Sequence, residues 1–302
     1  MSKIDPSWDL YRTFLAVLSE GSLSAAARDL GLTQPTVGRH VDALEQAVGF
    51  ELFMRTPQGL RPTEAALALK PYAETMAASA AALRRAATGT LLEVSGTVRI
   101  SASEVIGVEV LPPILAALQE QHPRLVIELS PSDAVEDLLR QQADIAVRMV
   151  EPAQDALVTQ RIGDIPLGFH AHRRYLERHG TPAQIEDLAV HRLIGFDRQT
   201  AFIRAMMKRA PLLTALNFTF RADSNLAQMA AMRAGIGIGI CQIAIARRDP
   251  DLVHLLPEIG FPLGTWVAMH ETLKSTPRCR ATFDALVAGL RTYVAATKPA
   301  QA

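Results

Sequence analysis

Gln34, Thr36 and Arg39 carry side chains that can contact the exposed groups of DNA. The glutamine amide can bond adenine through two hydrogen bonds, the guanidinium can bond guanine or a phosphate, and the threonine can touch a thymine methyl or a phosphate oxygen. On the helical period, Thr36 and Arg39 share a face with Pro35, and Gln34 lies at its exposed tip. A helix-turn-helix motif places this part of its second helix against base edges. The stretch 34–46 is therefore a candidate recognition helix.

The surrounding sequence predicts two helices joined by a tight turn. Ser22 or Ser24 can cap the first helix, since a hydroxyl there accepts from unpaired backbone N–H groups, and Gly31 can end it. Thr33 stands at the cap of the second helix. The buried face of that helix is predicted from apolar residues at spacings of four, three and four: Val37, Val41, Leu44 and Val48. Taken alone, this pattern fits a recognition helix and equally the solvated face of an ordinary helical hairpin.

Segments on both sides of the motif favour DNA binding. An earlier amphipathic helix that completes a three-helix core is predicted from Leu10, Phe14, Val17 and Leu18. Residues 52–55 and 60–62 are predicted to form two short strands joined by a turn at 56–59, which together make a wing. We expect one surface to be lined by four basic residues: Arg39, His40, Arg55 and Arg61.

The run from Phe14 to Ala65 resembles the winged helix-turn-helix of LysR-type transcriptional regulators nearly position by position. The residues that carry the resemblance are Phe14, Gly21-Ser22, Ala26-Ala27, Leu30, Gln34-Pro35, Leu44-Glu45, Gly49, Leu52-Phe53, Arg55 and Thr63. The sequence departs from the family pattern at Gly38, where many members have a serine that touches DNA, and at Ala66, which replaces a common glycine. The predicted DNA-binding residues are Ser24, Thr33, Gln34, Pro35, Thr36, Gly38, Arg39, His40, Arg55 and Arg61.

Length and composition describe an ordinary two-domain protein. The chain has 302 residues, of which 49% are hydrophobic and 21% charged. No apolar run follows the first residues, and the longest apolar stretch, 234–241, is too short to cross a membrane. We therefore expect a cytoplasmic location and no membrane partner.

Net charge gives little support for DNA binding. Residues 1–65 hold six basic and eight acidic side chains, a formal charge of −2. A strongly basic domain is the usual sign of a nucleic-acid binder. The prediction therefore depends on where the basic residues lie, and modest non-specific affinity is expected because only phosphate contacts contribute its salt-sensitive part.

Residues 64–92 are predicted to form one long helix. A heptad-like seam runs along it through Leu69, Tyr72, Met76, Ala80, Leu83 and Ala87. Two copies of such a seam could pair, which is the dimer that the resemblance implies; the alternative is a helix packed on its own domain. Pro71 should bend the helix, and 88–96 is predicted to be a hinge. The predicted domains are thus 1–65, a linker helix 66–92 and a domain 97–302.

Strands alternate with helices in the remainder of the chain, which predicts parallel pairing in a two-faced α/β sheet. The first unit is predicted from segments 98–100, 111–121, 126–129, 135–141 and 144–147. The second is predicted to start near Pro166, with segments 167–171, 193–196, 217–220, 225–233 and 236–240, a return strand at 266–270 and a closing helix at 280–295. These segments resemble the family's two-lobed effector domain, which has the fold of periplasmic binding proteins. The expected lobes are about 97–166 with 270–302, and 167–269.

Polar residues follow the predicted strands, where ligands of such folds bind between the lobes. The predicted effector-binding residues are Ser101, Ser103, Ser132, Arg148, Phe196 and Ser224, and a small anionic or polar effector would suit them. The alternative for each serine is a helix cap, and for Arg148 it is a surface ion pair.

Other patterns do not support an enzyme, a metal site or a cofactor. The glycines at 235, 237 and 239 follow a helix, whereas a dinucleotide loop lies between a strand and a helix. Cys241 and Cys279 are interpreted as reduced, partly buried thiols, with a redox switch as the alternative. The eight histidines show no metal-ligand spacing, and no catalytic motif is present.

We therefore predict a sequence-specific DNA-binding transcriptional regulator whose C-terminal domain binds a small-molecule effector. The expected partners are double-stranded promoter DNA, RNA polymerase and further copies of the chain, as a homodimer and as a homotetramer assembled through the effector domains. The alternative functions are a solute-binding protein of a transport system and an enzyme on a two-lobed scaffold.

Overall fold

The computed structural model describes residues 5–56, 59–87, 93–133, 143–152, 157–198, 203–204 and 218–297. These residues divide into two compact units, the winged unit up to Ala87 and the second unit from Glu93 onward. The predicted helix at 135–141, the turn residues 57–58 and the hinge residues 88–92 lie outside the described residues. No helix in the described part of the chain is long and apolar enough to cross a membrane.

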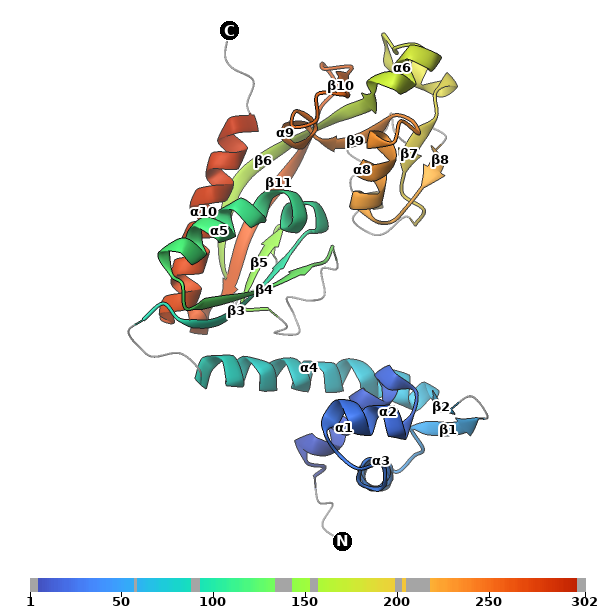
Figure 1. Ribbon diagram of the computed structural model, residues 1–302, viewed down its shortest axis with the longest axis vertical. Coiled ribbons are helices and arrows are strands. Elements are labelled where there is room, and N and C mark those ends of the chain that lie inside the picture. Colours follow the sequence, from blue (N-terminus) through green and yellow to red (C-terminus); the bar gives the residue numbers. More distant parts are fainter. Residues whose placement is uncertain are drawn as a thin grey trace. The chain divides into compact units, whose positions relative to one another are not determined.

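The winged unit has the predicted three helices and hairpin (Figure 1). Its elements are α1 (Trp8–Glu20), α2 (Leu23–Leu30), α3 (Gln34–Val48), β1 (Phe53–Thr56), β2 (Gly59–Pro62) and the long helix α4 (Glu64–Ala87). Val37, Val41 and Leu44 are buried against Phe14 and Val17 of α1, so the apolar spacing predicted the packed faces of both helices.

Three contacts fix the wing to the helices. The Leu60 N–H donates to the Gly21 carbonyl at the end of α1, with N and O 2.8 Å apart. The Phe14 and Phe53 rings pack with their centroids 5.8 Å apart. The Glu45 carboxylate of α3 accepts from the backbone N–H groups of Leu52 (2.6 Å) and Phe53 (3.2 Å). The position of the hairpin is thus set by the helix that precedes it.

Helix α4 begins as part of the winged core. Ala66 and Ala73 are fully buried, and Leu69 packs against the same core. The prediction that Leu69 belongs to an outward seam was therefore wrong, because this first part of α4 covers α1. The helix is not interrupted at Pro71, and its exposed large apolar residues are Leu67, Tyr72, Met76 and Leu83.

The second unit is built on one large sheet. Its strands and flanking helices are β3 (Gly96–Ala102), α5 (Leu111–Gln121), β4 (Leu125–Pro131), β5 (Ile145–Arg148), β6 (Leu157–His172), β10 (Leu252–Leu255), β11 (Phe261–His270) and α10 (Pro277–Thr297). Among the described residues the strand order is β10-β6-β11-β5-β3-β4, with β9 also paired to β6. Figure 1 shows β6 and β11 running the length of this unit.

Parallel pairing holds for only part of the sheet, and the return strand predicted at 266–270 is part of the antiparallel strand β11. Strands β4 and β5 pair parallel to β3, but β11 lies between β5 and β6 and is antiparallel to both. Strand β6 takes the chain from the first lobe into the second, and β11 returns it, so the two must run in opposite directions. Strand β6 also begins at Leu157, ten residues before the predicted start.

The second lobe packs on the far halves of β6 and β11. Its elements are α6 (Arg173–His179), β7 (Leu193–Gly195), β8 (Phe218–Arg221), α8 (Asn225–Arg233), β9 (Gly239–Gln242) and α9 (Ile243–Ala246). Helix α8 ends before Gly235, whose φ is +69°, and β9 starts three residues later than predicted. Met229 and Met232 of α8 lie in the same apolar core as Ile106 and Leu111 of the first lobe. The lobes therefore share a continuous core.

Two glycines of the winged unit should respond to substitution in opposite directions. Gly59 has a φ of +122°, and a Cβ there would lie 2.7 Å from the Gly21 carbonyl oxygen, whereas the nearest atom to a Cβ on Gly38 would be 3.8 Å away. Gly59→Ala should destabilise the winged unit by roughly 1–3 kcal/mol. Gly38→Ala should stabilise it by roughly 0.5–1 kcal/mol, because alanine loses less conformational entropy than glycine inside a helix and its methyl group has space here. Hydrogen exchange of α3 and β2 amides measures both changes; slower exchange in Gly59→Ala would contradict the proposed wing anchor.

Candidate nucleic-acid interface and interlobe site

The start of α3 is held by its own cap. The Thr33 hydroxyl accepts from the Thr36 N–H at 3.4 Å, and the two threonine hydroxyls are hydrogen bonded at 2.9 Å. Ser22, rather than Ser24, caps α2, accepting from the Ala25 N–H at 3.2 Å. Gln34, Pro35 and Arg39 are exposed beside the Thr33 cap, and Ser24 is exposed on α2. The polar face predicted for α3 is thus free of contacts with the unit's core.

His40 differs from its neighbours on α3. Its ring is half-buried, and its Nδ1 lies 2.9 Å from the hydroxyl oxygen of Thr13 in α1. Because the Thr13 hydroxyl donates to the Asp9 carbonyl, Nδ1 is the donor in this pair. In the neutral ring Nε2 then has no proton to donate, so a contact with a phosphate oxygen requires a ring that is protonated on both nitrogens. Gly38, also half-buried, has space for a side chain.

The wing arginines lie on opposite faces of the hairpin. Arg61 is paired with Met54, and Arg55 is paired with Leu60. Paired residues of an antiparallel hairpin point to the same side, and successive residues alternate. Both arginines are exposed. The expectation that they line one surface with Arg39 was therefore wrong: each face of the wing carries one arginine.

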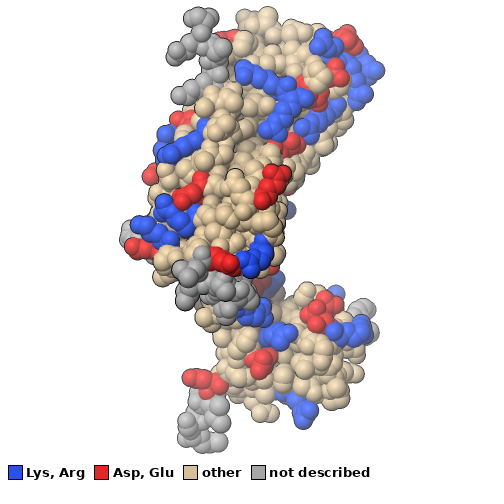
Figure 2. Space-filling view, turned by 60° about the vertical axis from the view of Figure 1, so that its left-hand side comes forward, with Lys and Arg blue, Asp and Glu red and all other residues tan. Residues whose placement is uncertain are grey.

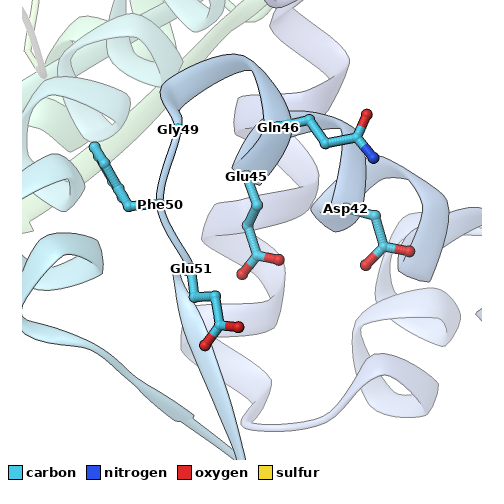
Figure 3. A pocket seen from close by; sticks show the side chains of 6 residues that line it. All are labelled: Asp42, Glu45, Gln46, Gly49, Phe50 and Glu51. Atoms are coloured by element: carbon cyan, nitrogen blue, oxygen red, sulfur yellow. The ribbon is translucent and has the colours of Figure 1, made fainter.

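A shallow, open hollow lies at the far end of α3 (Figure 3). It is lined by Asp42, Glu45, Gln46, Gly49, Phe50 and Glu51. Its three carboxylates would repel phosphates, so this end of α3 is unsuited to DNA. On the face of the winged unit that Figure 2 presents, basic and acidic side chains occur together, in line with its balanced charge.

The predicted effector-binding residues gather where β3, β4 and β5 end. Ser101 is the second-to-last residue of β3, and its hydroxyl oxygen accepts from Arg148 Nη2 of β5 at 2.6 Å. Arg148 is only 3% exposed, so the alternative of a surface ion pair was wrong. Ser103 is buried, and Ser132 is half-buried with its N–H bonded to the Ala102 carbonyl at 2.7 Å. Parallel strands bring these serines together because their carboxyl ends share one edge of the sheet.

Ser224 belongs to this group and is also a helix cap. Its hydroxyl accepts from the Ala227 N–H at 3.2 Å and donates to the Glu104 carboxylate of the first lobe at 2.9 Å. Phe196, half-buried after β7, precedes Asp197, whose N–H donates to Asp223 at 3.2 Å. The Ser224–Glu104 contact therefore joins the second lobe to this group, whereas the Asp197 contact stays within the second lobe.

Sequence reasoning missed two carboxylates here. Glu104 and Asp133 directly follow the predicted residues Ser103 and Ser132, and the Glu104 N–H donates to Asp133 Oδ1 at 3.0 Å. Asp133 Oδ2 accepts from the Asn225 side chain at 2.9 Å. The signal that could have found them is a carboxylate in the same position after two neighbouring parallel strands.

Comparison with known proteins identifies both units. A family model described as "LysR substrate binding domain" matches residues 92–291, and one described as "Bacterial regulatory helix-turn-helix protein, lysR family" matches residues 8–67. This chain belongs to the LysR family. It is accordingly a DNA-binding transcriptional regulator with an effector-binding domain, and not the solute-binding protein held as an alternative.

Several curated relatives of this LysR-family chain are regulators. It is 27% identical over 253 residues to the probable regulator LtrA of Klebsiella pneumoniae, covering 82% of each chain. It is 23% identical to DmlR of Escherichia coli, covering 91% of this chain and 92% of the relative. The match to CrgA of Neisseria meningitidis, at 28% identity, covers 61% of each.

Solved LysR structures have the same fold. The full-length CbnR structure in complex with its target DNA has a TM-score of 0.65 and 21% identity, covering 94% of this chain and 99% of that one. The CrgA structure has a TM-score of 0.59 and 23% identity, covering 93% and 98%.

The cysteines of this LysR regulator are poor redox groups. Cys241 and Cys279 form no disulfide, and both are more deeply buried than the partial burial predicted. Burial raises the pKa of the Cys241 thiol to about 12. The thiolate is the reactive form of cysteine, so the Cys241 thiol is unreactive at neutral pH. The described residues contain no cluster of metal-binding side chains.

Acid should weaken the effector domain through His170. Burial lowers the pKa of this ring from 6.5 to about 4, with smaller contributions from His254 and Arg247, while the Gly168 carbonyl acts in the opposite direction. The unfolded chain binds more protons between these pH values, so the stability gained from the neutral ring is complete above pH 6.5 and is lost as pH falls toward 4. The loss should reach roughly 3 kcal/mol. His170→Asn keeps a hydrogen-bond donor for the Gly168 carbonyl but has no imidazole. The free energy of unfolding, measured by urea denaturation between pH 7 and 4.5, should therefore fall less with pH in this variant than in wild type. An equal fall in the two proteins would refute the assignment to His170.

Proposed function

We propose that α3 and the wing read an operator in promoter DNA, with Gln34 and Arg39 contacting bases. The observation that carries this proposal is the contact-free polar face at the start of α3, next to a wing that Glu45 fixes to the same helix. Ser24, Thr33, Pro35, Thr36 and Gly38 would lie against the sugar-phosphate backbone and groove edges, and His40 would reach the backbone through Nε2 when both ring nitrogens carry protons. Phosphate contacts of this kind set the register of the protein, and base contacts give the specificity.

The two faces of the wing suit a groove with phosphates on both sides. Arg55 and Arg61 point to opposite faces of the hairpin. A hairpin placed edge-on along a minor groove would bring one arginine toward each phosphate wall. Because few cations take part, we expect modest non-specific affinity and a shallow dependence on salt.

Pairing of two copies through α4 would double the number of bases read. The winged core leaves three large apolar residues of α4 exposed: Tyr72, Met76 and Leu83. A helix with such a face gains stability when a second copy covers it. A dimer would bind two half-sites of a pseudo-palindromic operator, since symmetric proteins prefer symmetric sites. Further pairing through the effector domains would give a tetramer able to bend promoter DNA beside RNA polymerase.

The effector would bind between the lobes, beside Ser101, Ser103, Ser132 and Arg148 at the end of the sheet and Ser224, which reaches Glu104 from the second lobe. Phe196 would complete this site from the second lobe. Hydroxyl groups and a buried guanidinium suit a small polar or anionic molecule. Such a molecule changes the regulator only as far as it binds one arrangement of the lobes better than another.

DNA binding is tested with the double variant Gln34→Ala, Arg39→Ala. Each good bidentate pair contributes about 1–3 kcal/mol of discrimination. Loss of two base contacts should therefore weaken operator binding by more than about tenfold. Gln46→Ala is the matched control, because Gln46 is exposed on the same helix but lines the acidic hollow. Selection of genomic fragments followed by titration at fixed salt gives both affinities. Equal affinity for the double variant and wild type would rule out base reading by α3.

The effector site is tested by filling it. Ser132 is half-buried at the end of β4, so Ser132→Trp should obstruct the site, and Ser103→Ala should remove a hydroxyl from it. A thermal-shift screen against small organic acids, amino acids and amines would supply a binding compound. Both variants should lose most of its stabilising effect yet keep wild-type affinity for operator DNA. Unaltered thermal shifts in both variants would remove this site from the mechanism.

A further inference from the structure

Helix α8 of the second lobe is held at both ends by one short segment of the first lobe. The segment runs from Glu104 to Glu109 and includes most of a π-helical turn at Ile106–Val110. Such turns are rare in proteins and are frequent at functional sites. The segment directly follows β3 and its candidate effector-binding serines.

At the start of α8, the Glu104 carboxylate spans the two lobes. Ser224 donates its hydroxyl to both carboxylate oxygens, at 2.9 and 3.0 Å, and the Leu226 N–H lies 3.4 Å from Oε2. Beside it, the Asn225 amide donates to Asp133 of the first lobe at 2.9 Å. A carboxylate at a helix N-terminus is favoured by the helix dipole and by the free N–H groups of the first turn.

At the end of α8, Glu109 has the matching position. Arg233, the last residue of α8, donates to Glu109 Oε1 from its two terminal nitrogens at 3.3 and 3.4 Å. Arg248 donates to the Glu109 carbonyl at 2.6 Å. Arg233 also lies 3.9 Å from Asp249 of its own lobe. The cation at the C-terminus of α8 again has the sign that the dipole favours.

These contacts determine how the lobes can move. The chain passes between the lobes along β6 and β11, and a rotation about those strands would change the distance between α8 and the segment 104–109. The buried methionines of α8 resist sliding along the shared core. The polar contacts at both ends of α8 then select one position among those that the core would allow.

We propose that Glu104 and Glu109 form a clamp on α8 that holds the lobes in this arrangement, and that the effector acts by releasing its Glu104 end. The second part rests on the proposed function. Glu104 lies between Ser103 and Ser224, so a polar molecule entering the site meets the Glu104 contact first. The Leu226 N–H lies 3.4 Å from this carboxylate, so a polar molecule needs to replace chiefly the two contacts with the Ser224 hydroxyl. Release frees the N-terminus of α8 without unfolding either lobe.

The clamp is tested in the full chain without DNA or effector. Spin labels are attached at Glu120→Cys on α5 and Glu177→Cys on α6, two exposed positions in different lobes, while the native cysteines stay buried. Glu104→Ala should broaden or shift the interlobe distance distribution and raise hydrogen exchange of the first α8 amides at least tenfold. The matched control is Glu128→Ala, which removes a carboxylate paired with Arg99 at 3.2 Å within the first lobe and should change neither readout.

A conservative variant keeps the test decisive if Glu104→Ala does not fold. Glu104→Gln retains an acceptor but removes the charge, and it should give a smaller change in the same direction. Distance distributions and exchange equal to wild type in the folded variants would overturn the clamp.

The effector step is tested separately, by the footprint of the protein on operator DNA. Glu104→Ala should alter this footprint without any added compound. An unchanged footprint with altered lobe distances would overturn that step alone, whereas absence of operator binding by wild type would count against the proposed function.

Discussion

The antiparallel ladder between β6 and β11 is the constraint on which the second unit depends. One strand carries the chain out of the first lobe and the other brings it back, and their pairing over ten residues makes the two lobes parts of one sheet. The lobes cannot separate without breaking this ladder, so their motion is limited to twisting and bending of two long strands. Contacts of modest strength between the lobes, such as those around α8, are therefore enough to select a position.

The winged unit follows the same logic on a smaller scale. Its hairpin is too short to be stable by itself. Glu45 and the Gly21 carbonyl fix it through backbone N–H groups, so the exposed side chains of Met54, Arg55 and Arg61 stay available to a partner. The carboxylate that holds the wing also contributes to an acidic hollow, so the same residue organises the surface and restricts where DNA can lie.

Much of this could be read from the sequence because local patterns determine it. The capping Thr33, the apolar spacing from Val37 to Leu44 and the helix at 225–233 all depend on neighbours a few residues away. What could not be read depends on distant residues. The place of β11 between β5 and β6 depends on long-range strand pairing, the inward turn of His40 depends on Thr13, and Arg55 and Arg61 separate because of hairpin register. Glu104 and Asp133 were missed because their importance comes from α8, about ninety or more residues away in the chain.

The burial of Ala66 and Ala73 gives α4 the character of a lever. Since the first turns of this helix belong to the winged core, the recognition helix and the 24-residue α4 form one rigid body. At about 1.5 Å per residue the lever is roughly 36 Å long. A rotation of about 5° at one end then moves the other by roughly the 3.4 Å spacing of successive base pairs. A small rotation at the far end of α4 is therefore enough to displace the recognition helix by about one base pair along DNA.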